Sequence, residues 1–587
     1  MTDLSTNAVR VLRARYLRRD AAQNVIETPE ALFRRVASTI AEAEVVFGTA
    51  GDAVRWQDTF ETVMAGGDFL PNSPILMNAG TSLGQLAACF VVPVEDSMES
   101  IFEALKSMAL LQRAGGGTGF SFSALRPSGD VVGSTGGAAS GPVSFMRVFD
   151  CATENIKQGG RRRGANMGVL RVDHPDILEF VDAKLDGHSL QNFNLSVGVT
   201  DAFMRAAEAG EPYELVHPGR RRPIGRLPAR DVFERIVQSA WSCGDPGMLF
   251  LDAINRANPL PALGPIEATN PCGEVPLLPW ESCILGSINL AHVVTGGAVD
   301  WERLRTLVHV GARFLDDAIE VNRDVLPPVA AATRRSRKIG LGVMGFAECL
   351  ILLGVAYDSD QAATWADRLS AFISAEARKA SRSLAEERGV FPEWSRSVYA
   401  AAGEQLRNAT QVSIAPTGTL SIIAGTSGGI EPLFALAYRR QHTLGGAPIV
   451  EINPIFRRHV EGLGVDGDRL LDHVRVAGHL GGLPDVPDAA RRLFVTATEI
   501  PVRRHLAIQQ AFQRHVDNAV SKTINLPADQ STAQVAEAYR EGWRLGLKGV
   551  TVYRARAKPG EVLTLGVDEP VEARELFAKC DPGACRL

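Results

Sequence analysis

Cysteine is scarce in this chain, and both long apolar runs and an excess of basic residues are missing. Eight cysteines in 587 residues are too few for a disulfide scaffold, so we expect reduced thiols and a cytoplasmic location. The longest apolar run, 349–356, is far shorter than the roughly 20 residues of a membrane helix. The charged start MTDLSTNAVRVLRARYLRRD has no signal-peptide core,. With 62 basic against 67 acidic residues, nothing supports a nucleic-acid partner, and we expect no membrane partner either.

Hydrophobic residues make up 45% of the chain, enough for a large core. Residues 1–67 have apolar positions at helical spacing and a Thr-Pro helix start at Thr28, which predicts an N-terminal helical lobe,. Residues 68–555 alternate short apolar segments with helical patterns, which predicts an α/β domain,. Residues 556–587 have the composition of a flexible tail,. The clearest predicted helices are 101–113, 301–321, 361–388 and 532–546, and the predicted strands are 247–252, 411–416 and 549–554.

The cysteines fall into two groups by their surroundings. Cys151 and Cys349 lie in helical patterns and Cys243 follows one, so we expect these three to be small core residues,. Cys272 and Cys283 instead belong to ATNPCGEVPLLPWESCILGSINL, a Pro- and Gly-rich segment between apolar runs, which predicts a loop inserted between core elements,.

A last pair, Cys580 and Cys585, ends the chain in KCDPGACRL. Two thiols on a flexible tail indicate a disulfide shuttle. The alternatives are an inert end or half of a zinc site, for which the sequence offers no second close Cys or His pair.

Four glycine-rich stretches have backbone N–H groups that could hold phosphates. None has the spacing of the dinucleotide fingerprint or of the Walker loop. Together, one of them with three successive arginines, they favour a polyphosphate ligand. They are GGGTGFSFS at 115–123, GSTGGAASGP at 133–142, QGGRRRGANMG at 158–168 and APTGTLSIIAGTSGGIEP at 415–432.

A family resemblance joins these motifs. In order, the chain contains PNSPILMNAG, CFVVPVEDSMESI, GGGTGFSFSALRPSGD, GGRRRGANMGVLRVDHPDI, NPCGEVPL, ESCILGSINL and APTGTLS. From about residue 10 to 556 it resembles the catalytic chain of ribonucleotide reductases, and especially the adenosylcobalamin-dependent class II enzymes. The resemblance implies a ten-stranded α/β barrel, made of two parallel five-stranded halves, with the 270–283 loop at its centre.

The resemblance also implies the chemistry, the reduction of ribonucleoside diphosphates to 2′-deoxyribonucleoside diphosphates for DNA synthesis and repair. Cys272 would become a thiyl radical that takes the 3′ hydrogen, with Glu274 as general base and Asn270 hydrogen-bonded to the sugar. Cys89 and Cys283 would supply two electrons and form a disulfide. Cys580 and Cys585 would reduce that disulfide and be restored by thioredoxin or a similar dithiol.

Other positions match the nucleotide-binding residues of the family. The matched substrate-binding positions are Ser73, Ala88, Cys89, Gly117, Asn270, Pro416, Thr417, Gly418, Thr419 and Ser421. The matched positions for a deoxynucleoside triphosphate effector, near the interface of a homodimer, are Asp96, Ser97, Arg126 and Arg162. For Asp96 the alternative is a helix N-cap before SMESIF.

The radical source follows by comparison within the family. Class I chains carry adjacent tyrosines where LKGVTVYRAR has Thr551 and Val552, and no C-terminal glycyl-radical motif is found. Adenosylcobalamin is therefore the expected cofactor, and no side chain is expected to ligate a metal. Ile284 stands where relatives have Asn, which makes the surroundings of Cys283 uncertain. The short N-terminus predicts no ATP-cone. The alternatives are a class I type chain that needs a radical-generating subunit, and a degenerate nucleotide-binding regulatory protein.

Overall fold

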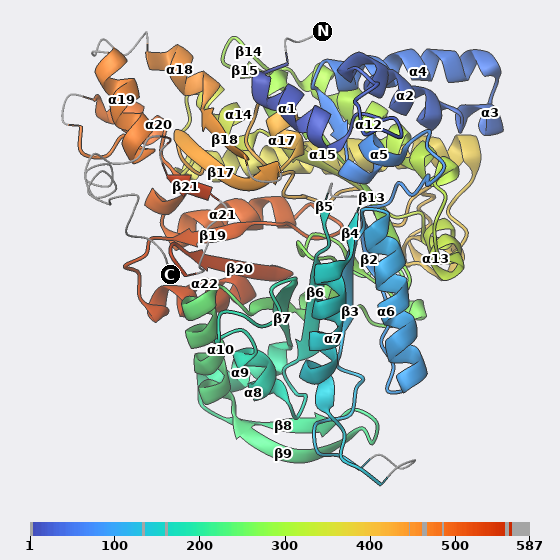
Figure 1. Ribbon diagram of the computed structural model, residues 1–587, viewed down its shortest axis with the longest axis vertical. Coiled ribbons are helices and arrows are strands. Elements are labelled where there is room, and N and C mark those ends of the chain that lie inside the picture. Colours follow the sequence, from blue (N-terminus) through green and yellow to red (C-terminus); the bar gives the residue numbers. More distant parts are fainter. Residues whose placement is uncertain are drawn as a thin grey trace.

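The computed structural model describes residues 4–131, 136–158, 162–444, 447–460, 467–483, 486–557, 563–565 and 567. Figure 1 shows the N-terminal helices at the top of the molecule, above a barrel of strands surrounded by helices. The first helices are α1 (Thr6–Arg15), α2 (Pro29–Ala41), α3 (Glu44–Phe47), α4 (Ala50–Ala65) and α5 (Ser73–Asn78). The predicted start of α2 is confirmed, because the Thr28 hydroxyl caps the helix by accepting a hydrogen bond from Ala31 N at 3.2 Å,.

The first half of the barrel is a parallel five-stranded sheet in chain order. Its strands are β2 (Cys89–Val91), β3 (Gly117–Ser121), β6 (Asn166–Arg171), β7 (Phe193–Val199) and β10 (Gly247–Phe250). The connecting helices are α6 (Met98–Arg113), α7 (Gly141–Asn155), α8 (Ile177–Asp182), α9 (Asp201–Ala209) and α10 (Ala229–Cys243). Below them in Figure 1 projects the hairpin of β8 (Pro212–His217) and β9 (Arg222–Pro228).

The second half repeats this parallel arrangement. Two single bridges, Leu341 to Val412 and Ile414 to Val520, stand where a regular strand is expected at 411–416. The regular strands of this half are β13 (Ser282–Asn289), β16 (Ile339–Met344), β19 (Thr523–Leu526) and β20 (Gly549–Arg554). Its main helices are α12 (Trp301–Val321), α13 (Pro327–Ser336), α14 (Phe346–Leu352), α15 (Asp360–Arg388), α21 (Val502–Gln513) and α22 (Thr532–Arg544).

The two halves join by antiparallel pairs at both edges. β10 pairs with β20 on one side, and β2 pairs with β13 on the other. With the two single bridges this closes the ring, and the ten-stranded α/β barrel is confirmed. β1 (Phe69–Pro71) pairs with the far end of β13. A smaller antiparallel sheet of β17 (Ala437–Leu444), β18 (Ala447–Ile452) and β21 (Leu563–Leu565) lies at the upper left of Figure 1 with α18 (Pro454–Val460), α19 (Gly467–Ala477) and α20 (Asp488–Leu493).

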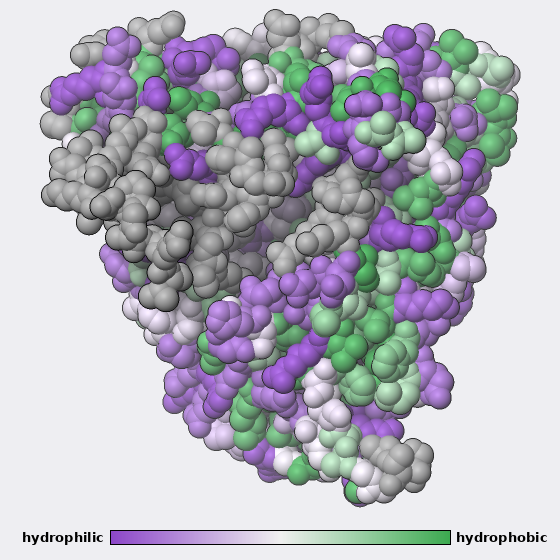
Figure 2. All heavy atoms as spheres, in the orientation of Figure 1, coloured by the Kyte–Doolittle hydropathy of each residue, from purple (hydrophilic) through white to green (hydrophobic). Residues whose placement is uncertain are grey.

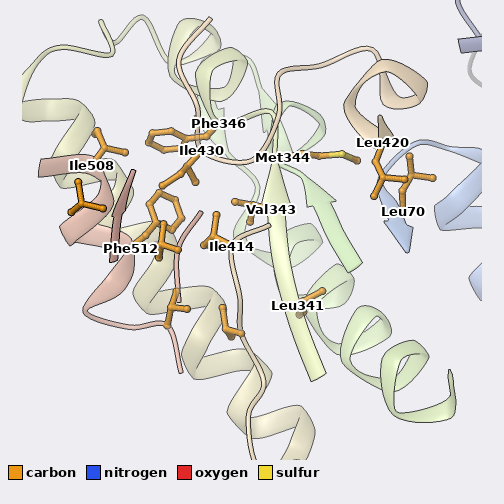
Figure 3. Close-up of a cluster of buried hydrophobic side chains, with 14 of the residues drawn as sticks. Leu70, Leu341, Val343, Met344, Phe346, Ile414, Leu420, Ile430, Ile508 and Phe512 are labelled. Atoms are coloured by element: carbon orange, nitrogen blue, oxygen red, sulfur yellow. The ribbon is translucent and has the colours of Figure 1, made fainter. Parts of the chain in front are cut away.

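Strand residues alternate between two hydrophobic clusters, as the two-residue period of a strand requires. Cys89, Cys283 and Leu285 belong to the smaller cluster inside the barrel. Phe90 and Ile284 belong to the larger cluster between the barrel and its helices. Figure 3 shows part of that outer cluster, where strand β16 meets the helices that cover it. Phe346 and Phe512 meet there edge to face, with ring centroids 5.3 Å apart,.

One core prediction is wrong. Cys151 lies in α7, as its helical pattern indicated, but it is exposed. Helical spacing identifies the helix and not which flank of its apolar stripe stays uncovered. Cys349 is buried in α14, and Cys243, at the end of α10, is half-buried.

Candidate active site

A hairpin loop carries the first functional side chains into the barrel. Strands β11 (Ala268–Thr269) and β12 (Pro276–Leu277) pair antiparallel, and residues 270–275 form the turn between them. We call residues 268–277 the finger loop. Its apolar residues belong to the same interior cluster as Cys89 and Cys283. The predicted insertion of a loop into the core is therefore confirmed for residues 270–275, but Cys283, which the sequence placed in the same loop, lies in strand β13 because its apolar neighbours pair with β16.

Hydrogen bonds from both halves of the barrel hold the finger loop. The Ser413 hydroxyl and the Ala519 backbone N–H both donate to the Glu274 carbonyl oxygen, at 2.8 and 2.9 Å. From the other half, the Asn194 side chain donates to the Pro271 carbonyl oxygen at 2.7 Å. Within the loop, Asn270 Oδ1 accepts from the Val275 N–H at 3.0 Å. The backbone that carries Asn270, Cys272 and Glu274 is thus fixed at several points.

The glycine-rich strand β3 makes room for this loop. A Cβ atom placed on Gly119 would lie 1.8 Å from the Thr269 carbonyl oxygen. A Cβ on Gly117 would lie 3.0 Å from the Pro271 ring. Part of the GGGTG stretch therefore permits close approach of two backbones, which is a role separate from phosphate binding.

Three cysteines meet at the finger loop in different environments. Cys89 and Cys283 face each other directly across the antiparallel pair of β2 and β13, and both are buried. Burial raises the pKa of the Cys283 thiol far above its ordinary value, so the thiol stays protonated,. Cys272 is exposed and lines the pocket described below.

Cys89 links the two polar side chains of the loop. Asn270 Nδ2 donates to Cys89 Sγ at 3.2 Å, and the Cys89 thiol points to Glu274 Oε1 at 3.9 Å. Glu274 and Asn270 are each only 2% exposed. A carboxylate, an amide and a thiol are therefore assembled beside Cys272, from segments more than 180 residues apart in sequence.

A pocket opens over this group of side chains. Cys89, Asn270, Cys272 and Glu274 line one wall. Nine of the ten matched substrate-binding positions line it, namely Ser73, Ala88, Cys89, Gly117, Asn270, Pro416, Thr417, Gly418 and Thr419. Ser421 is not among the lining residues; it is buried and lines a neighbouring cavity instead. Three of the four glycine-rich stretches contribute to this pocket, and the described part of 133–142 does not.

The 417–419 turn has an unusual backbone. Thr417 has φ of 49°, a left-handed conformation that is uncommon for a residue other than glycine. Its hydroxyl accepts a hydrogen bond from the Gly429 N–H at 2.8 Å, which helps to hold the turn. The short helix α17 (Leu420–Ala424) follows directly. The turn presents its hydroxyls and backbone amides along the pocket wall.

Sequence reasoning missed several pocket residues. Arg15 and Tyr16, at the end of α1, line the pocket although their segment reads only as part of a helical lobe. Gln112 and Ser287 line it as well. No local motif marks these positions, because they reach the pocket through the packing of α1, α6 and β13 on the rest of the molecule.

Two of the positions matched to effector binding, Asp96 and Ser97, lie at the start of α6. Arg126 Nε donates to both carboxylate oxygens of Asp96, at 3.1 and 2.8 Å. The alternative role of Asp96 as N-cap is wrong, because Ser97 caps α6 by accepting from the Ser100 N–H at 3.1 Å. The backbone of Arg162 lies in the two-residue strand β5 (Arg162–Arg163), paired with β4 (Lys157–Gln158), and its side chain lies outside what the structure describes.

Three further sequence predictions have mixed outcomes. Ile284, which stands where relatives have Asn, does not contribute to the surroundings of the Cys283 thiol. Its side chain packs in the outer cluster, on the face of β13 opposite to Cys283. Thr551 and Val552 lie in β20, paired with Thr523 and Ile524 of β19. Cys580 and Cys585 lie outside the described residues.

Within the described part of the chain, no cluster of three or more His, Cys, Asp or Glu is placed to hold a metal, and no helix is both long and apolar enough to cross a membrane.

Comparison with known proteins agrees with this architecture. The family model described as ribonucleotide reductase, barrel domain, matches residues 87–406 and 401–553, and that for the all-alpha domain matches residues 2–84. A solved class Id ribonucleotide reductase alpha subunit from Actinobacillus ureae shares the fold, with a TM-score of 0.76 and 24% identity, covering 94% of this chain and 97% of that one.

Two curated relatives carry the name vitamin B12-dependent ribonucleoside-diphosphate reductase. The one from Mycobacterium tuberculosis strain H37Rv is 51% identical over 100% of this chain and 83% of its own length. The one from Thermoplasma acidophilum is 46% identical over 97% of this chain and 82% of its own length. The resemblance indicated by the sequence motifs is confirmed, and the chain belongs to the ribonucleotide reductase family as a large catalytic chain.

Proposed function

We propose that this chain is a ribonucleoside-diphosphate reductase that depends on adenosylcobalamin. The observation that carries the proposal is the finger loop, which brings the exposed Cys272 thiol and the buried Glu274 carboxylate to one pocket beside Cys89, whose strand partner is the buried Cys283. Replacement of a 2′-hydroxyl by hydrogen needs these groups, because the hydroxyl is a poor leaving group on an unactivated carbon. The names of the close relatives support the same reaction.

Cys272 is the residue that exchanges a hydrogen atom with the substrate. As a thiyl radical it takes the 3′ hydrogen of the ribose, and as a thiol it returns a hydrogen atom at the end. Its exposure toward the pocket supports this role, since Cys89 and Cys283 are buried behind it. The anchored finger loop keeps the sulfur in one place during both transfers,.

Glu274 and Asn270 handle the sugar hydroxyls. Glu274 accepts the 3′-hydroxyl proton, which helps the 2′-hydroxyl to depart as water after it is protonated. Asn270 positions the sugar by hydrogen bonding. Glu274 Oε1 lies 3.9 Å and Asn270 Nδ2 lies 3.2 Å from Cys89 Sγ. This proximity supports a proton path from the Cys89 thiol to the leaving hydroxyl.

Cys89 and Cys283 supply the two electrons. Directly opposed residues of antiparallel strands have Cα atoms about 4.5–5.5 Å apart, which lies within the roughly 4.4–6.8 Å span of a disulfide. Oxidation therefore joins the two sulfurs with little movement of β2 and β13. The pKa of Cys283, raised by burial, keeps its sulfur protonated as a thiol,. Cys580 and Cys585 then reduce the disulfide and are restored by thioredoxin or a similar dithiol in the cytoplasm.

Adenosylcobalamin supplies the unpaired electron when it is bound, by homolysis of its cobalt–carbon bond. The residues present fit such a group, because the thiol to be oxidised is the exposed one. A second cavity adjoins the pocket and shares Pro416 and Gly418 with it. We assign the cofactor to this cavity, whose apolar Leu433 and Phe434 and polar Asn453 suit a macrocycle that carries amide groups.

Effector binding and dimerisation belong to the same proposal. Asp96, Ser97 and Arg126 form the effector site together with Arg162. Beside them, Met98 and Phe102 of α6 and Val148 of α7 are 55, 48 and 41% exposed. Figure 2 shows hydrophobic side chains over α6 on this face. An apolar surface of this kind favours a homodimer through α6 and α7, with a deoxynucleoside triphosphate bound near the interface.

The decisive assay uses the purified chain, each of the four ribonucleoside diphosphates, a dithiol and adenosylcobalamin, present or omitted. We expect deoxynucleotide only with the cofactor. Activity without it would overturn the cobalamin assignment and would favour the class I type alternative. Cys272→Ser tests the regulatory alternative, since it should abolish reduction and keep nucleotide binding; a Cys272→Ser chain that supports deoxynucleotide synthesis in cells would overturn the enzyme assignment.

A further inference from the structure

The end of the pocket nearest the 417–419 turn is built partly by the first helix of the chain. Arg15, the last residue of α1, donates from Nη1 to the Thr419 hydroxyl at 3.1 Å. The next residue, Tyr16, is buried and shares a 2.8 Å hydrogen bond with the Ser73 hydroxyl. Helix α1 therefore contacts two of the hydroxyls that line this end of the pocket.

Arg15 is also the only basic side chain among the described residues that line the pocket. The other ionisable groups there are Glu274, Tyr16 and the cysteines. A nucleoside diphosphate carries several negative charges at its phosphate end, and enclosing them without a cation is unfavourable. A guanidinium can bond a hydroxyl through one nitrogen and a phosphate oxygen through another.

Asn72 provides a second, independent sign of a ligand at this end. It is 7% exposed and lines the pocket beside Ser73. Its Oδ1 caps helix α5 by accepting from the Ile75 N–H at 3.2 Å, which fixes the orientation of the amide. Its Nδ2 is buried and has no hydrogen-bond partner among the described residues. A buried amide donor of this kind is usually paired, and an anionic ligand oxygen would pair it.

We propose that Arg15 and Asn72 complete the phosphate subsite, and that Arg15 makes the enzyme prefer a diphosphate to a less charged nucleotide. The inference rests on the proposed function, because it takes the ribonucleoside diphosphate as the occupant. It assigns a substrate contact to the helical lobe, so that the all-helical and barrel parts of the chain share one site. Ser73 and Thr419 are held by the same helix that carries the cation.

The first test is Arg15→Gln in the full chain with adenosylcobalamin and effector present. We expect KM for ADP to rise about 10-fold to 100-fold, as for loss of a charge-assisted hydrogen bond, with kcat changed less than about threefold. Equilibrium dialysis should show a similar loss for ADP, a smaller one for AMP and almost none for adenosine. Arg13→Gln is the matched control, since Arg13 lies on the exposed side of the same helix. An unchanged KM, or equal losses for ADP and adenosine, would overturn the assignment.

The second test separates binding from folding. Asn72→Asp keeps an N-cap for α5 but replaces the amide donor by a carboxylate that repels phosphate. We expect KM for ADP to rise at least 10-fold with Tm unchanged, and an unaltered KM would exclude Asn72 from the subsite. If the wild-type chain reduces no diphosphate, the proposed function itself fails; if it does and Arg15→Gln behaves like wild type, only the present inference fails.

Discussion

The packing of Gly119 against the finger loop gives the sharpest prediction about catalysis. In Gly119→Ala, the new methyl group would lie 1.8 Å from the Thr269 carbonyl oxygen, whereas Cβ atoms in proteins essentially never approach another heavy atom closer than 3.0 Å. The loop and strand β3 must therefore separate by at least about 1.2 Å, an overpacking of the kind that destabilises by roughly 1–3 kcal/mol. Because Thr269 immediately precedes Asn270, a displacement of Thr269 also moves Asn270 in the finger loop.

A misplacement of about 1 Å in a positioned catalytic group can lower the rate by about 100-fold. We therefore expect Gly119→Ala to lower kcat by at least that factor while the chain stays folded. Steady-state reduction of a ribonucleoside diphosphate with an external dithiol measures kcat, and single-turnover reduction without the dithiol counts the product formed by the internal cysteines. Effector binding and Tm, measured on the same sample, report whether the barrel is intact.

Gly51→Ala is the matched control, because a Cβ there would meet only the Thr49 hydroxyl oxygen at 3.6 Å, an ordinary contact in the exposed helix α4. This variant should keep wild-type kcat and be as stable as wild type or slightly more so. Full activity of Gly119→Ala, or a loss of activity that follows unfolding alone, would contradict this prediction.

Three further predictions test the redox pair, the effector site and a buried lysine. Cys283→Ser should form less than about one hundredth of the wild-type amount of product per active site. Cys349→Ala is the control, because it removes an equally buried thiol that lies outside the barrel, and it should keep turnover. Equal activity of the two variants would contradict the assignment of Cys89 and Cys283 as the redox pair. Arg126→Gln breaks the ion pair with Asp96, so the ratio of rates for two substrates should stop responding to added deoxynucleoside triphosphates, and a normal response would remove Arg126 from the site. Burial lowers the pKa of Lys548 to about 8, whereas the unfolded chain holds that proton up to about 10.4. Between these two pH values the unfolded state thus binds more protons than the folded state. The free energy of unfolding of wild type relative to Lys548→Met should therefore rise with pH in this range, by up to about 1.4 kcal/mol per pH unit. Denaturant unfolding at pH 7.5 and 9.5 measures this difference, and a smaller difference at pH 9.5 would contradict the prediction.

The elements that the sequence predicted best are those with a strong local period. α12 begins and ends where the pattern indicated, at 301 and 321, and β20 matches the predicted 549–554. The poorest strand prediction, 411–416, makes single bridges at Val412 and Ile414. The pairing of this segment depends on residues from distant parts of the chain. One of them is Gly342, whose backbone lies close to that of Ser413.

The candidate site divides in the same way. Motif residues such as Cys272, Glu274 and Thr417 could be proposed because their neighbours in sequence are themselves distinctive. Arg15 and Gln112 lie outside the quoted motifs, and only the folded pocket brings them to the positions matched to substrate binding. For Cys151 the sequence predicted a buried core residue and the structure shows an exposed one. A helical period does not indicate whether another element covers a given flank of the helix.

The residue pattern alone was enough to identify the α/β class and the family, and to nominate Cys272, Glu274 and Asn270 as candidate site residues, because these depend on residue types at short spacings. Only the folded chain shows that Cys89 faces Cys283, that Gly119 makes room for the finger loop, that Ile284 lies on the face of β13 opposite to Cys283 and that Arg15 reaches Thr419. Each of these is a contact between segments distant in sequence, and such contacts are fixed by barrel closure and side-chain packing, which no local pattern encodes. The scarce cysteines thus become distinguishable only in the folded barrel, where Cys89 and Cys272 line one pocket and Cys283 lies opposite Cys89.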